Sequence, residues 1–144
     1  MRHEVFQAIV ARLASDSALA TSLGGAHVYR RQAGRPAQAP SITLAENTES
    51  STTRAGYRAS KVRDSTSVLQ VDVWVSESEG TFPCTGEDAD LIAERIDEIL
   101  LDATAPISGT RGWVKTTASQ QFENDTCIWH NALRYAFRYS LTDT

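Results

Sequence analysis

The sequence predicts an α+β fold in which helices pack on one face of a mostly antiparallel sheet. Three observations lead to this prediction. Residues 68–75 alternate between aliphatic side chains and polar or aromatic ones, which is typical of a half-buried strand. Residues 86–103 carry apolar side chains at spacings of three and four, which is typical of an amphipathic helix. Residues 127–141 form the longest alternating segment and predict a second long strand.

The chain opens with a helical region in two parts. An apolar stripe predicts a first helix from residue 3 to about Ala14, since Ser15-Asp16-Ser17 favours a cap over a helix interior. A second, short helix is expected over 17–23, ended by the pair Gly24-Gly25. The stripe of the first helix consists of Phe6, Ile9, Val10 and Leu13.

Two short strands and a long polar segment follow. Strands are expected at 27–29 and 41–46, separated by a stretch that Pro36 and Pro40 keep irregular. Residues 47–67 are polar and predict a loop of about 20 residues. Because it offers few apolar anchors, we expect this loop to become ordered only against a neighbouring subunit. Its cations are Arg54, Arg58, Lys61 and Arg63.

The central strand and helix have the clearest two-sided patterns. Thr85 and Asp88 resemble a capping box, with Asp in place of the usual Glu, and predict where the helix begins. On the strand, Leu69, Val71, Val73 and Val75 point one way, and Gln70, Asp72 and Trp74 the other. The apolar helix face, which we expect to pack on the sheet, consists of Ala89, Ile92, Ile96, Ile99, Leu100 and Ala103. The acidic face consists of Asp90, Glu94, Asp97 and Glu98.

The C-terminal third predicts a hairpin. A weak strand at 113–122 is followed by an Asn124-Asp125 turn and the strand 127–141. Fifteen residues at ~3.3 Å each span about 50 Å, so this strand must bend, bulge or project past the domain edge. One face carries Trp129, Asn131, Leu133, Tyr135, Phe137, Tyr139 and Leu141. The other carries His130, Arg134 and Arg138.

Length and charge set broad limits. At 144 residues, the chain is expected to form a single domain over 1–144. No stretch is apolar enough to predict a membrane span or a signal peptide, so we expect a cytoplasmic compartment. Residues 1–75 have a net charge of +3 and residues 76–144 of −7. This asymmetry would let two copies meet through opposite charges. A solvated acidic helix and a solvated basic loop explain it equally well.

No group of residues predicts catalysis. His3, His27 and His130 share no metal-ligand spacing, and there is no nucleophile elbow or phosphate-binding glycine loop. A hydrolase or transferase using His130 is less favoured than a structural histidine, because nothing near it in the sequence would tune its pKa. We therefore predict no catalytic, cofactor-binding or metal-binding residues, and we expect no cofactor.

The order of these motifs resembles the tail-terminator, or tail-completion, proteins of long-tailed bacteriophages. The opening VARLASDSALATSLGGAHVY is similar to that family's helix, short second helix and Val-Tyr strand start. The run LQVDVWV followed by GEDADLIAERIDEIL is similar to its central strand and amphipathic helix. The ending FENDTCIWHNALRYAFRYSL resembles its final hairpin. Segment 47–67 departs from the family in being richer in Arg and Thr.

The resemblance implies a non-enzymatic virion protein. Such proteins form a ring, typically of six copies, that caps the head-proximal end of the tail tube, stops its polymerisation and joins the tail to the head. The implied partners are further copies of the chain, the tail tube protein and the head–tail connector. Genomic DNA would pass through the ring without sequence-specific binding, and no membrane is involved.

Charge suggests which residues could lie between subunits. The candidate subunit interface pairs the basic loop of one copy with the acidic helix face of the next. A head-side connector or neck protein is the first alternative function. A small nucleic-acid-binding module using 54–63 is less favoured, because only Tyr57 is interleaved and the chain is acidic. The candidate interface residues are Arg54, Arg58, Lys61, Arg63, Asp90, Glu94, Asp97 and Glu98.

Overall fold

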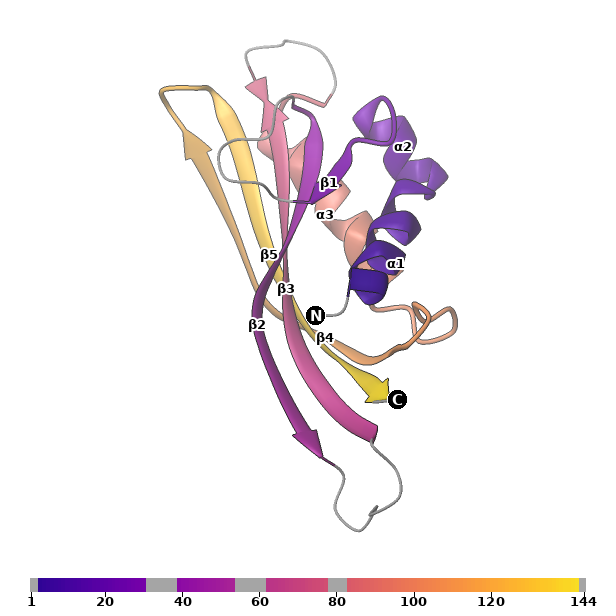
Figure 1. Ribbon diagram of the computed structural model, residues 1–144. Coiled ribbons are helices and arrows are strands. Elements are labelled where there is room, and N and C mark those ends of the chain that lie inside the picture. Colours follow the sequence, from indigo (N-terminus) through magenta and orange to yellow (C-terminus); the bar gives the residue numbers. More distant parts are fainter. Residues whose placement is uncertain (1–2, 31–38, 54–61, 78–82, 143–144) are drawn as a thin grey trace.

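The computed structural model describes residues 3–30, 39–53, 62–77 and 83–142, which form three helices and one five-stranded sheet (Figure 1). The elements are α1 (His3–Ala14), α2 (Ser17–Leu23), β1 (Val28–Arg30), β2 (Ser41–Thr53), β3 (Val62–Ser76), α3 (Gly86–Leu100), β4 (Thr110–Glu123) and β5 (Ile128–Thr142).

The sheet has the strand order β1-β2-β3-β5-β4. β1 runs parallel to β2, and every other neighbouring pair is antiparallel. The three helices lie on the same side of the sheet in Figure 1, where α3 packs on β3, β5 and β4 and α1 contacts β1. The predicted α+β class is therefore confirmed.

The core lies between α3 and the central strands. The aliphatic side of β3 (Leu69, Val71, Val73 and Val75) is fully buried, as is Ile96 of α3. The predicted apolar face of the helix is confirmed except at its end. Ala103 is exposed, because the helix ends at Leu100 and the chain has already turned away.

The start of α3 follows the capping-box prediction. The Thr85 Oγ1 accepts a hydrogen bond from the Asp88 backbone N–H at 3.2 Å, and the Asp88 Oδ2 accepts one from the Thr85 N–H at 3.0 Å. Two N–H groups at the helix end are thus satisfied by two side chains within one turn. This is a local arrangement, which is why four residues of sequence suffice to predict it.

The two faces of β5 are also confirmed. Asn131, Leu133, Tyr135, Phe137 and Tyr139 are buried. Arg134 and Arg138 are exposed on the opposite face, and the side chain of Leu141 lies outside the described residues. The strand pairs with β3 along its whole length, from Ser76↔Ile128 to Val62↔Thr142. Figure 1 shows the far ends of β2 and β3 extending beyond the helices.

The predicted loop at 47–67 is wrong for most of its length. Residues 47–53 belong to β2 and 62–67 to β3, and the two strands pair from Ser41↔Trp74 to Thr53↔Arg63. The expectation that this segment becomes ordered against a neighbouring subunit stays a prediction. Residues 54–61 lie outside the described part of the chain.

The reason is that a strand needs a paired backbone and not an apolar side. A bulge between Glu46 and Thr48 shifts the register and interrupts the alternation from which strands are predicted. Ser65 and Ser67 then occupy positions that face the helix side, where both are fully buried. Thr-rich segments also have a high β propensity.

An ion pair links the start of α2 to α3. Asp16 caps α2 by accepting from the Leu19 N–H at 3.0 Å. Its carboxylate also accepts two hydrogen bonds from Arg95, one donated by Nη2 at 2.6 Å and one donated by Nε at 3.0 Å. Chiefly because of the bonds from Arg95, the pKa of Asp16 is lowered from its ordinary value. Asp16 therefore joins the two helices while it caps one of them.

We expect Ile96→Asp to lower the free energy of unfolding by roughly 3–5 kcal/mol, because it places an unpaired charge at a fully buried position. Ala103→Asp is the matched control, since it adds the same charge at an exposed position and should change little. Urea denaturation of the two variants measures both values. Equal stability of the two would contradict the assignment of the helix faces.

Asp16→Asn keeps a capping side chain but removes the charge that Arg95 binds. Because the folded pKa of Asp16 is lowered, its stabilisation is complete above the unfolded pKa of about 3.9 and is lost as the pH falls through the folded pKa. The variant should therefore be less stable than wild type by about 1 kcal/mol at pH 7, and the difference should shrink towards pH 2. Urea denaturation across this pH range measures it.

Asp125→Asn, in the exposed turn that follows β4, serves as the control and should match wild type throughout. A stability gap for Asp16→Asn that stays constant from pH 7 to pH 2 would mean that the Arg95 pair contributes nothing.

Candidate functional site

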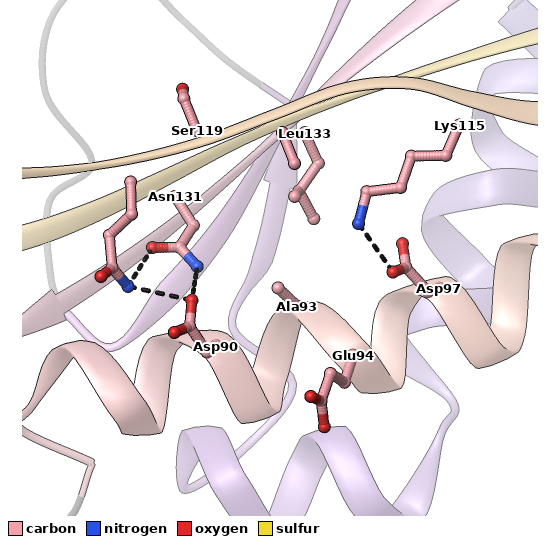
Figure 2. A pocket seen from close by; sticks show the side chains of 10 residues that line it. Asp90, Ala93, Glu94, Asp97, Lys115, Ser119, Asn131 and Leu133 are labelled. Atoms are coloured by element: carbon pink, nitrogen blue, oxygen red, sulfur yellow. Dashed lines mark hydrogen bonds and ion pairs between the residues drawn. The ribbon is translucent and has the colours of Figure 1, made fainter.

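A groove with polar and apolar lining residues runs between α3 and the strands β4 and β5 (Figure 2). Its volume is about 340 Å³. It is lined by Asp90, Ala93, Glu94, Asp97, Lys115, Ala118, Ser119, Gln120, Asn131 and Leu133. The edge strand β4 thus lies along one wall, and two of its polar side chains reach across to the helix.

At one end of the groove, Asp90, Gln120 and Asn131 form a closed network. The Asn131 Nδ2 donates to Asp90 Oδ1 at 2.9 Å. The Gln120 Nε2 lies 3.0 Å from the same oxygen and 2.8 Å from Asn131 Oδ1. Asn131 is only 3% exposed, so these bonds satisfy a side chain that would otherwise be costly to bury. The network fixes the helix against the sheet.

At the other end, Asp97 binds two residues of the sheet. The Lys115 Nζ lies 2.7 Å from Asp97 Oδ2, and the Tyr135 hydroxyl donates to Asp97 Oδ1. Burial, and then the hydrogen bond to Asp97, raises the pKa of Tyr135 above its ordinary value. The phenol is therefore a neutral donor, and Asp97 is committed to contacts within the chain.

The four acidic residues of the predicted interface therefore differ in the contacts that they already make within the chain. Asp90 and Asp97 point towards the sheet, and Glu98 accepts from Arg95 Nη1 at 2.8 Å. Glu94 is exposed, and in Figure 2 it points away from the Asp90 and Asp97 contacts. A helical pattern alone could not reveal this difference, since it does not say where β4 would lie.

The structure describes little of the basic half of the predicted interface. Arg54, Arg58 and Lys61 lie outside the described residues, and of Arg63 only the backbone, within β3, is described. Pairing between this segment and the acidic helix therefore stays a prediction.

On the opposite face of the sheet, Asp72 is fully buried beside His130. The His130 Nε2 lies 2.7 Å from Asp72 Oδ1, and the Gln70 Nε2 donates to the same oxygen at 3.1 Å. Trp74 stacks on the imidazole at 3.9 Å between ring centroids and donates through Nε1 to Thr43 Oγ1 at 3.0 Å. The pairing of β3 with β5 places Trp74 opposite His130, and so brings Asp72 within hydrogen-bond distance of the imidazole.

Sequence reasoning missed this pair. It expected nothing near His130, whereas the carboxylate that binds it is 58 residues away in the chain. Asp72 was the available signal, because a carboxylate in the middle of a strand needs a partner when it is buried. Among the residues that the structure describes, no hydroxyl or thiol bonds to His130, so the geometry is that of a satisfied structural histidine.

Within the described ranges, no group of three or more His, Cys, Asp or Glu side chains is placed to hold a metal ion. None of their helices is long and apolar enough to cross a membrane.

Comparison with known proteins gives a family and a fold. The family model described as "Tail completion protein gp17" matches residues 7–140. No curated protein matches the sequence. Among solved structures, a chain in the "Virion of native gene transfer agent (GTA) particle" is similar, with a TM-score of 0.64 and 17% sequence identity over 94% of this chain and 93% of that one. At that identity, the likeness shows the fold.

The family match covers both ends of the architecture described above, from the first helix to the last strand. It confirms the resemblance seen in the sequence motifs. A tail completion protein is a structural component of the phage tail, and its place is in the virion. The chain belongs to the tail completion protein gp17 family.

Proposed function

We propose that this protein forms a ring, hexameric as in the proteins it resembles, at the head-proximal end of the phage tail tube. There it stops tube polymerisation and joins the tail to the head. The observation that carries the proposal is the tail completion match over residues 7–140, nearly the whole chain. That match favours the terminator over the head-side neck protein, since the family is one of tail proteins.

A ring built from identical subunits needs two different surfaces on each copy that fit one another. The uneven charge of the chain supplies a basis for this, with +3 in residues 1–75 and −7 in residues 76–144. The candidate interface of the sequence analysis remains part of the proposal. Glu94 is its best acidic member, because Asp90 and Asp97 are already bound to the sheet and Glu98 is paired with Arg95.

The proposed role needs no catalysis. Its partners would be further copies of the chain, the tail tube protein and the head–tail connector, with genomic DNA passing through the ring. Among the described residues, Asp72 and His130 form an acid–histidine pair that is held by Gln70 and by the ring of Trp74. Such a pair serves packing better than proton transfer, which needs a reacting group within hydrogen-bond reach.

Loss of the protein should give tails of excessive length or tails unattached to heads. The reason is that nothing would then cover the growing end of the tube. Electron microscopy of lysates from a phage lacking this chain measures both defects, and supplying the wild-type chain in trans should restore normal particles. Head-joined tails of normal length in its absence would rule out the proposed function.

Arg58→Glu together with Lys61→Glu should weaken ring assembly and make it more sensitive to salt, because the variant repels acids on a neighbouring copy. Native mass spectrometry over a salt series measures the assembled fraction. Arg58→Lys with Lys61→Arg is the matched control, as it keeps both charges and should assemble normally. An unchanged assembled fraction for the Glu variant would remove this segment from the interface.

A further inference from the structure

The face of the sheet that carries Asp72 and His130 also carries an exposed basic patch. Arg134 and Arg138 lie four residues apart on β5, with Ala136 between them, and both arginines are exposed. Val114 of the edge strand β4 pairs with Ala136 and is 58% exposed. We name these four residues the sheet patch. Neither arginine has a hydrogen bond or ion pair from its side chain to the described side chains.

The outer side of α3 carries the opposite pattern. Glu87, Leu91, Glu94 and Glu98 follow one another at spacings of four, three and four, so they share one face of the helix. We name these four residues the helix stripe. Leu91 is 52% exposed, and the three glutamates around it are exposed as well. This face points away from the core, because the buried side of α3 is the one that carries Ile96.

Each of the two surfaces contains one large hydrophobic side chain that is exposed. The structure describes four large hydrophobic side chains that are exposed, namely Tyr29, Leu91, Leu101 and Val114. One of them is the centre of the helix stripe and another belongs to the sheet patch, and Leu101 follows the stripe at the end of α3. Apolar side chains surrounded by charges are the usual anatomy of a protein–protein interface.

The surfaces also match in spacing and sign. Glu87 and Glu94 flank Leu91 and are seven helical residues apart, or about 10 Å along the axis. Arg134 and Arg138 flank the Val114–Ala136 pair and are four strand residues apart, or about 13 Å. A difference of about 3 Å is within reach of flexible side chains such as Glu and Arg. Two glutamates could therefore meet two arginines while Leu91 covers Val114.

We propose that the helix stripe of one copy docks on the sheet patch of the next copy around the ring, so that Arg134 and Arg138, and not the 54–63 segment, are the main counterpart of Glu87 and Glu94. This inference rests on the proposed function and names the surfaces that would build it. The stripe faces outward from the helical layer and the patch lies on the helix-free side of the described sheet. Each copy can therefore use both at once. A contact between two different surfaces is the type that closes into a ring when the rotation per subunit allows it.

The test is a charge exchange in the full-length chain, read by native mass spectrometry and sedimentation. Arg134→Glu with Arg138→Glu should raise the subunit dissociation constant by about tenfold or more, since like charges then face one another. Glu87→Arg with Glu94→Arg should do the same. The chain that carries all four changes should assemble close to wild type, because every contact again pairs opposite charges.

Arg134→Lys with Arg138→Lys is the matched control and should assemble as the wild type does. All substituted positions are exposed, so thermal unfolding curves of the variants should overlay that of the wild type under conditions that keep the chain monomeric. If both double variants fail to assemble and the chain that combines all four substitutions also stays dissociated, the pairing of the two surfaces is overturned.

Other outcomes would overturn the inference in distinguishable ways. Normal assembly of Arg134→Glu with Arg138→Glu would exclude the sheet patch from the interface and leave the ring intact. If that variant instead assembled normally but lost affinity for a short DNA duplex, the arginines would face nucleic acid. Rescue of Arg58→Glu with Lys61→Glu by the helix-stripe reversal would make the 54–63 segment the counterpart. A wild-type chain that stays monomeric would overturn the ring itself.

Discussion

The structure depends above all on the pairing of β3 with β5. These two strands lie side by side over 15 residues each, from Val62↔Thr142 to Ser76↔Ile128. Their inner faces form the floor on which α3 packs, and β2 and β4 extend the sheet outward from them. Because antiparallel partners lie directly opposite, the same ladder also sets which polar residues meet on the other face. Trp74 and His130 are stacked for that reason.

The three sides of helix α3 have different environments. Its apolar side completes the core through residues such as Ile92 and Ile96. The side towards β4 is polar and is bound by the sheet through Asp90 and Asp97. The outer side keeps its acidic residues in solvent. An assembly protein benefits from this division, because charges on the outer side are available to a partner without any change in the fold.

This arrangement suits a protein that works by contact with others. Among the described side chains of the helix-free face, the buried carboxylate Asp72 is satisfied by His130 and Gln70, so the centre of that face is cross-linked by side-chain hydrogen bonds. Exposed arginines lie beside it on β5. A rigid sheet with charged margins loses little conformational entropy when a second molecule binds it, which favours repeated association of identical subunits.

The sequence by itself determined the features that depend on near neighbours. The alternation of Leu69, Val71, Val73 and Val75 identified a buried strand side, and Thr85 with Asp88 identified the start of α3. The family resemblance came from the order of such local elements. These signals are reliable because one helical turn or one strand face contains the whole interaction.

Only the tertiary structure decided what depends on distant partners. Residues 47–53 and 62–67 form strands because each backbone has the other to pair with, although their side chains predicted a loop. Asp97 binds Tyr135 and Lys115, and Asp72 binds His130, because the sheet brings together residues far apart in the chain. A one-dimensional pattern records the charge of an acid but not the group that neutralises it, and that group is supplied by the fold.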